Sequence, residues 1–110
     1  MEDFPQVIVI ADDVYDFLTF DDKPFETFAA IGNNFNRTVT VYSGGKLFNC
    51  TGWKCGWGIG PAHFIKPAGL LNYGSIYCGN HPTQVAMAKS LEKAQEPGYN
   101  GTDKSYSQIV

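Results

Sequence analysis

Three short apolar runs along the chain predict β-strands. Val7 to Ala11 is a continuous apolar run rich in β-branched residues, which is typical of a strand buried on both faces of a parallel sheet. A second run covers Thr38 to Tyr42, and a third, Cys55 to Ile59, is expected to pair with the second as an antiparallel neighbour. Between the first two runs, a turn is predicted over residues 21–24 and a short helical segment from Phe25 to Ile31.

Two later segments carry the signals of longer helices. Pro61 suits the first position of a helix that runs toward Tyr73, with a kink at Pro67 because an interior proline lacks a backbone N–H. Pro82 is expected to open a second helix, and Pro97 with the following glycine to stop it. The residues that recur at helical spacing in this second helix are Met87, Ala88, Leu91, Ala94 and Gln95. The order of elements predicts an α/β fold, a mostly parallel sheet flanked by helices.

The segment from Ser43 to Trp57 carries the densest candidate chemistry, with two lysines, a serine and four glycines directly after a predicted strand. Glycines let a backbone approach an anion closely, and free N–H groups and a hydroxyl can bind phosphate oxygens. A nucleotide P-loop fits poorly, because Leu47 follows Lys46 where a hydroxyl residue is needed. Two interpretations stay open. Either Lys46 is a nucleophile that forms a Schiff base with an aldehyde cofactor whose phosphate binds Ser43 and Lys54, or it is a solvent-exposed lysine in a turn.

Acidic residues follow the first predicted strand at the end where open α/β sheets bind ligands. Asp12 and Asp13 come at the carboxyl end of that strand, and the second strand delivers the lysine segment to the same edge. If the two strands lie side by side or one apart, with neighbouring strands about 4.8 Å from each other, Asp12 and Lys46 can face opposite sides of one small ring. Taken singly, either aspartate is also explained as a helix N-cap or as part of a solvated turn.

Several segments resemble, in order and spacing, the core of the fold-type I pyridoxal-phosphate aminotransferases. They are Asp12 to Tyr15, Arg37 to Val41, Ser43 to Lys46, Thr51 to Trp57, and Gly60 with Pro61. The similarity extends over most of the chain and is strongest to the group of kynurenine aminotransferase, glutamine transaminase and cysteine-S-conjugate β-lyase. The resemblance implies an enzyme that uses pyridoxal 5′-phosphate to transfer an amino group between an amino acid and a 2-oxo acid, and a homodimer in the full-length form.

The resemblance also implies roles for five residues. Lys46 would hold the cofactor as a Schiff base and then shuttle a proton at the substrate's α-carbon. Asp12 would accept a hydrogen bond from the pyridine nitrogen, and Tyr15 would bind the ring's 3′ oxygen. Ser43 and Lys54 would bind the phosphate, and a lysine at position 54 keeps the charge of the arginine that many family members have there.

Tyr77 matches a position where members of this group carry an aromatic residue that reaches the partner subunit's active site, and an ordinary core aromatic is the alternative. Compared with the family, the chain lacks the aromatic that stacks on the cofactor and the arginine that holds the substrate's α-carboxylate. Residues 1–110 are therefore expected to be a fragment of the large, cofactor-binding domain. The alternative function is that of a truncated remnant, or a partial gene model, without activity of its own.

Composition narrows the expected partners. Hydrophobic residues make up 44% of the 110 positions and aromatic residues 15%, which indicates a globular chain rather than a disordered one. The net charge of −3 gives no electrostatic basis for binding nucleic acid or an anionic membrane. A metal site is not expected, because the cysteines and histidines are scattered without ligand spacing.

The expected location is cytoplasmic, because no signal peptide is apparent and the three cysteines suit a reducing compartment. A mitochondrial location follows if a missing N-terminus carries a transit peptide. The sequons that begin at Asn36, Asn49 and Asn100 leave a secreted glycoprotein as the alternative.

Overall fold

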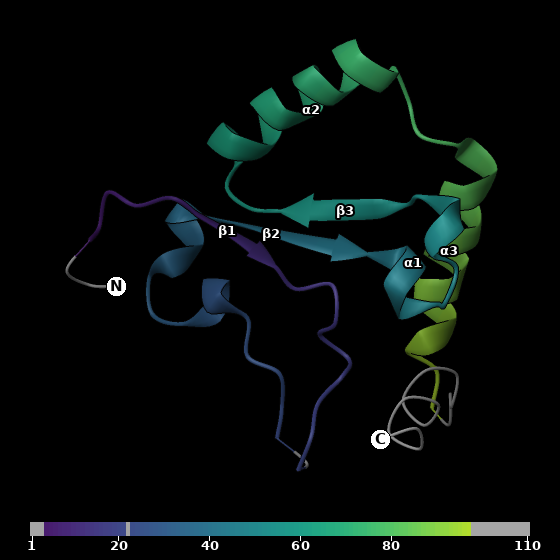
Figure 1. Cartoon of the computed structure of the whole chain (residues 1–110), viewed down its shortest axis with the longest axis horizontal. Helices are drawn as coiled ribbons and strands as arrows, with labels where there is room; N and C mark the ends of the chain where they lie inside the picture. The colour runs from purple at the N-terminus through teal and green to yellow at the C-terminus, as the bar shows by residue number, and fades with distance from the viewer. Residues whose placement is uncertain (1–3, 22, 98–110) are drawn as a thin grey trace.

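The computed structural model of the chain describes residues 4–21 and 23–97. Three strands, β1 (Val9–Asp12), β2 (Thr38–Ser43) and β3 (Gly56–Ile59), form one sheet in the order β1-β2-β3. β1 and β2 are parallel and β3 is antiparallel to β2, as the arrows in Figure 1 show. The antiparallel third strand is confirmed, and of the two arrangements left open for the first two strands, side by side or one apart, the structure has them side by side.

The register of the sheet determines which side chains share a face. Asp12 lies opposite Val41, and Ser43 lies opposite Gly56. Because side chains alternate along a strand, Asp12, Val41 and Ser43 belong to one face of the sheet, called the Asp12 face below. Tyr42 belongs to the other, called the Tyr42 face.

β1 differs from the strand predicted at Val7 to Ala11. It begins two residues later, at Val9, and it includes Asp12. Burial on both faces is wrong for this chain, because the side chain of Ile10 is 74% exposed. The reason is that β1 is an edge strand, and the described residues leave its Ile10 side uncovered.

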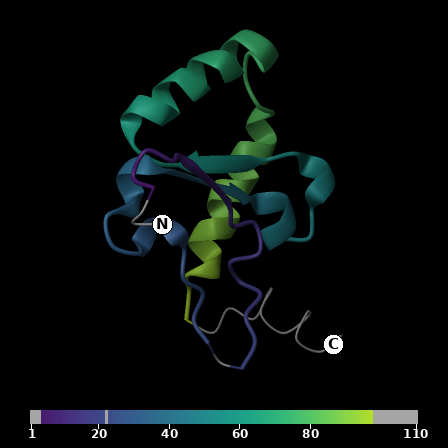
Figure 2. The ribbon, with the colours of Figure 1, turned by 60° about the vertical axis from the view of Figure 1, so that its left-hand side comes forward.

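The long connection between β1 and β2 contains two short 3-10 helices, η1 (Phe28–Ala30) and η2 (Asn34–Arg37). The first is shorter than the helical segment predicted from Phe25 to Ile31, and the second was not predicted. Gly32, with a φ of 56°, turns the chain between them, which glycine does without strain. The predicted turn over residues 21–24 includes Asp22, which lies outside the described residues. Figure 2 shows this connection extending away from the sheet.

Two longer helices follow the sheet. α2 (Ala62–Ile76) begins directly after Pro61, continues through Pro67 and ends three residues beyond the predicted limit at Tyr73. α3 (His81–Ala94) has Pro82 in its first turn, as predicted. In Figure 1, α2 arches beside β3, and α3 lies at the carboxyl end of β2.

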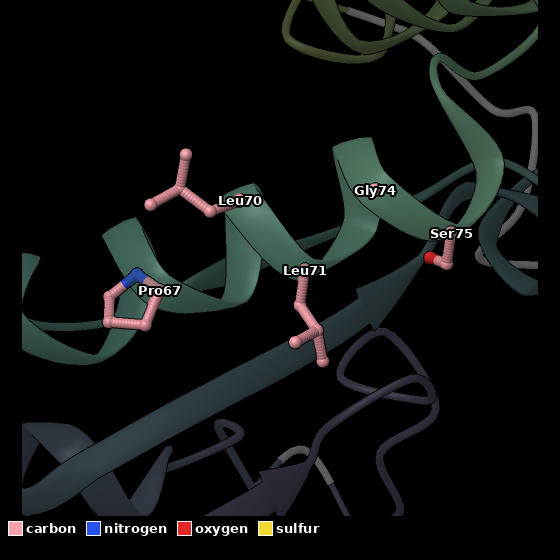
Figure 3. Close-up of a pocket in the computed structure, with 5 residues that line it drawn as sticks. All are labelled: Pro67, Leu70, Leu71, Gly74 and Ser75. Carbon is pink, nitrogen blue, oxygen red and sulfur yellow. The ribbon is translucent and has the colours of Figure 1, made fainter.

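Few side chains are buried in the described part of the chain. Thr38, Thr40 and Met87 are each less than 5% exposed, whereas Leu70 and Leu71 on α2 are 74% and 78% exposed. Figure 3 shows the shallow apolar hollow on α2 that is lined by Pro67, Leu70, Leu71, Gly74 and Ser75. α2 therefore presents apolar surface that the described residues do not cover.

Candidate functional site

Lys46 lies on a single helical turn, α1 (Gly44–Leu47), that begins where β2 ends. Ser43 is the N-cap of this turn, and its Oγ accepts a hydrogen bond of 3.3 Å from the Lys46 backbone N–H. The Cys50 N–H donates to the Gly45 carbonyl at 2.8 Å and fixes the chain after the turn. Sequence reasoning treated this segment as a loop, but the capped turn gives Lys46 a defined position at the edge of the sheet.

Tyr15 is the residue that the structure places against Lys46. It lies in the turn after β1, where its carbonyl accepts a hydrogen bond of 2.9 Å from the Leu18 N–H. The Lys46 Nζ lies 5.9 Å from the centroid of the Tyr15 ring, which is within the range of a cation–π contact. Two residues that are 31 positions apart in sequence are thus brought together because β1 and β2 are parallel neighbours.

The two aspartates after β1 are in different surroundings. Asp12 is exposed and belongs to the same face as Ser43. The Asp13 carboxylate instead accepts a hydrogen bond of 2.7 Å from the hydroxyl of Thr27, and its backbone N–H donates to the Val41 carbonyl at 3.1 Å. Of the two, Asp12 is the carboxylate that is accessible to a ligand on the Asp12 face.

Lys54 follows a short 3-10 helix, η3 (Thr51–Trp53), and has a left-handed backbone with a φ of 52°. This conformation is uncommon for a residue with a side chain, and such residues gather at functional sites. Its side chain is exposed and lines a cavity of about 580 Å³ between β3, α2 and α3. The Gly44 N–H donates to the carbonyl of the adjacent Cys55 at 3.1 Å, so this loop is tied to the start of α1.

The donor set suits the pyridoxal phosphate that the sequence resemblance implies. It offers an amine nucleophile, a carboxylate, a phenol and a serine hydroxyl, and it includes a second ammonium group on the neighbouring loop. The Ser43 oxygen accepts from the backbone, which leaves its proton for a phosphate oxygen. Gly56 and Gly58 lie opposite Ser43 and Val41, so no side chain projects from β3 on the Asp12 face there. A Cβ at Gly58 would lie 3.8 Å from the Ile65 Cδ1, so a side chain of α2 lies over this part of β3.

Tyr77 ends α2 with a φ of 66° and a ψ of −67°, and the Cys78 N–H donates to the Ile76 carbonyl at 2.8 Å. This is a γ-turn with a positive central φ, a rare and strained conformation. The side chain is 69% exposed and its ring centroid lies 5.0 Å from that of Tyr73. The alternative of a core aromatic is therefore wrong for this chain.

Arg37 is the chain's single arginine, and it lies at the opposite end of β2 from Lys46. Its guanidinium donates to the Asn34 Oδ1 at 2.6 and 3.1 Å and to the Phe4 carbonyl at 2.7 Å. It serves the connection before β2 and not the candidate site.

Sequence reasoning missed a polar group on the Tyr42 face. Thr27 donates to Asp13, and Thr27 and Tyr42 line the same small hollow. Burial raises the pKa of the Tyr42 phenol. Burial also raises the pKa of the nearby Asp16 carboxyl, and the charge of Asp13 adds to that increase. No local motif marks this group, since its members come from three separate segments.

Residues 4–21 and 23–97 hold no cluster of three or more histidine, cysteine or acidic side chains that could bind a metal ion. None of their helices has the length and apolarity needed to cross a membrane.

Comparison with known proteins gives one family match, to the family described as "Aminotransferase class I and II", over residues 3–105. A kynurenine–oxoglutarate transaminase of Dictyostelium discoideum is 38% identical over 95 residues. That alignment covers 86% of this chain and 22% of the relative. The chain thus spans about a fifth of the relative's length.

Solved structures agree with the sequence match. Bna3p of Saccharomyces cerevisiae, a candidate kynurenine aminotransferase, superposes on this chain with a TM-score of 0.84 at 31% sequence identity. The superposition covers 93% of this chain and 24% of the Bna3p chain. The N-succinyldiaminopimelate aminotransferase of Mycobacterium tuberculosis gives a TM-score of 0.75 at 39% identity, covering 80% of this chain and 23% of its own. The fold, a part of an α/β aminotransferase domain, is therefore shared with both.

Proposed function

Since this chain belongs to the class I and II aminotransferase family, we propose that it forms part of an enzyme that transfers an amino group between an amino acid and a 2-oxo acid. The observation that carries the proposal is the contact of the Lys46 Nζ with the Tyr15 ring. It occurs where two parallel strands end and where Asp12 and Ser43 share a face. Enzymes of this family use pyridoxal 5′-phosphate, which supplies a reactive aldehyde and an electron-withdrawing ring.

Lys46 is the proposed nucleophile. Lys46 would hold the cofactor through its aldehyde group, and its Nζ would take the proton from the substrate's α-carbon. An amine must be uncharged for both steps.

The other four residues are proposed to orient the cofactor ring and to bind its phosphate. Asp12 would accept a hydrogen bond from the pyridine nitrogen and favour its protonated form, and the Tyr15 hydroxyl would donate to the ring's 3′ oxygen. The Ser43 hydroxyl would donate to a phosphate oxygen, and Lys54 would provide a point charge for the same group. These roles agree with the exposure of Asp12 and with the position of Ser43 at the cap of α1.

We propose the kynurenine and glutamine type of transamination, because the relatives named for kynurenine include both a sequence match and the structure with the TM-score of 0.84. A second candidate is the N-succinyldiaminopimelate type, which is supported by a relative that is 40% identical over 86 residues. In the full-length form we propose a homodimer, with the exposed Tyr77 reaching the partner subunit's site.

The test uses a grafted protein, in which this chain replaces the segment that it matches in the Dictyostelium relative. Lys46→Arg keeps the charge but removes the amine that can attack, so we expect amino transfer to fall by roughly a thousandfold or more. Lys66→Arg makes the same change at an exposed lysine on α2, so it is the control and should keep the parental rate. A Lys46→Arg protein with a rate near the parent's would refute the proposal.

A further inference from the structure

We propose that Asp13, Thr27 and Tyr42 act as a positioning cluster that holds the carboxyl ends of β1 and β2 together and so sets the placement of Asp12 relative to Lys46. The inference rests on the proposed function, since it takes these last two residues as cofactor groups. None of the three cluster residues lies on the Asp12 face. Their effect on the site is therefore indirect.

Thr27 is the centre of the cluster. It occupies the N-cap position of η1, a place where threonine commonly caps its own helix, yet it makes no capping hydrogen bond. Its hydroxyl donates instead to the Asp13 carboxylate at 2.7 Å, across 14 positions of sequence. The bond joins the connection between the strands to the end of β1.

Tyr42 joins the cluster to β2. Thr27 and Tyr42 line one small hollow together with Thr40, which shares the Tyr42 face, so the Thr27 hydroxyl and the Tyr42 side chain lie on the same side of the sheet. The ring also stacks on Trp57 of β3, with centroids 6.0 Å apart and planes 22° apart. The cluster thus connects all three strands.

Two residues of the cluster are direct sequence neighbours of the proposed cofactor residues. Asp13 directly follows Asp12, and its backbone N–H donates to Val41 at 3.1 Å, just beyond the paired residues of β1. Tyr42 directly precedes Ser43, the cap of the turn that carries Lys46. If the cluster is broken, the two strand ends can separate, and the separation occurs where the cofactor groups begin.

The test compares two variants of Thr27 in the whole 110-residue chain. Thr27→Val keeps the shape but removes the hydroxyl, and Thr27→Ser restores a hydroxyl. Amide hydrogen exchange at Asp13 reports whether the strand ends separate. We expect Thr27→Val to speed it about fivefold to tenfold, the equivalent of one net hydrogen bond, and Thr27→Ser to return it close to the parental rate. Thr83→Val, which removes a comparable hydroxyl bond to Asn80 on α3, is the control and should leave Asp13 unchanged.

A second measurement is the fraction of Lys46 that becomes modified when the chain is treated with a limiting amount of pyridoxal phosphate and then with borohydride. We expect this fraction to fall severalfold in Thr27→Val and to recover in Thr27→Ser. The positioning role would be overturned if Thr27→Val left the amide exchange rate at Asp13 unchanged. It would also be overturned if Thr27→Val and Thr27→Ser lowered Lys46 modification equally, or if exchange at Asp13 became faster while Lys46 modification stayed the same. A parent chain that is not modified on Lys46 would count against the proposed function instead. In that case the exchange rates still decide whether the cluster holds the strand ends.

Discussion

At the scale of single residues, the account depends on Asp12 and Asp13 having different tasks although they are adjacent. Asp12 is exposed on the face that carries Ser43, and Asp13 is engaged by Thr27. A carboxylate opposite a pyridine nitrogen keeps the ring protonated and strengthens it as an electron acceptor. A carboxylate held by a hydroxyl on the other face cannot do this directly.

Asp12→Asn in the grafted protein should therefore keep the cofactor bound but slow exchange of the substrate's α-proton by on the order of a hundredfold. That is the usual effect of removing one preorganised electrostatic group. Asp13→Asn, the matched control, retains an oxygen that accepts from Thr27 and should have a much smaller effect. Proton exchange that is unaffected by Asp12→Asn would show that this carboxylate does not face the ring.

Asp16 predicts a dependence of stability on pH. Burial, with a smaller contribution from the charge of Asp13, raises its pKa above the ordinary value of 3.8. A raised carboxyl pKa means that the folded state holds the proton more tightly, so stability is lost as pH rises from the unfolded value through the folded one. Asp16→Asn should then raise the urea midpoint of the grafted protein at pH 7. The gain should disappear below about pH 3.8, and a gain that persists at low pH would contradict the assignment.

At the scale of elements, α1 depends on two buried glycines that meet different neighbours. A Cβ on Gly44 would overlap the side-chain end of Met87, which can move, whereas a Cβ on Gly45 would lie 2.8 Å from the Thr51 Cα. The Thr51 backbone could move away from such a Cβ only if the loop that leads to Lys54 shifted with it.

Gly45→Ala should therefore destabilise the grafted protein by about 1–3 kcal/mol, the usual cost of overpacking. Gly44→Ala should be close to neutral, since methionine adapts and alanine is the better helix former by about 1 kcal/mol. Urea unfolding of the two variants measures the difference. Equal costs would mean that the packing around α1 is not as described.

Some of the elements could be predicted from the sequence and others could not. The strands and the two long helices were predicted because their periodicity and prolines are local signals. The cofactor residues that the family resemblance implies stay a prediction. α1, η2 and the Thr27 bond to Asp13 were not predicted, since these depend on segments meeting in space. The burial of β1 was wrong for a related reason: an apolar run shows what a strand would bury, but not whether a neighbour is present to cover it.

At the scale of the whole molecule, uncovered apolar surface is the dominant feature. Ile10 on the edge strand and the pair Leu70 and Leu71 on α2 are each at least 74% exposed, and Met87 is the only apolar side chain described as buried. The assignment of residues 1–110 to a fragment of the large domain stays a prediction. Patches of this kind usually mark surfaces that associate.

The 110-residue chain alone is expected to associate with increasing concentration and to show no amino transfer, because Arg37 lies at the wrong end of β2 to hold a substrate carboxylate. Sedimentation velocity and an assay with pyridoxal phosphate, amino acids and a 2-oxo acid test both points. Replacing Leu70 and Leu71 together by glutamate should weaken association, whereas Lys66→Glu, which adds acid elsewhere on α2, should not. A monomeric parent with measurable amino transfer would contradict this expectation.

The most direct test of the central claim is to find which lysine pyridoxal phosphate attaches to. The grafted protein is incubated with the cofactor, reduced with borohydride so that the C=N bond becomes a stable amine, and digested for peptide mapping by mass spectrometry. The account predicts the adduct on the peptide that contains Lys46 and its loss in Lys46→Arg. An adduct on Lys54 or another lysine, or no adduct at all, would contradict it.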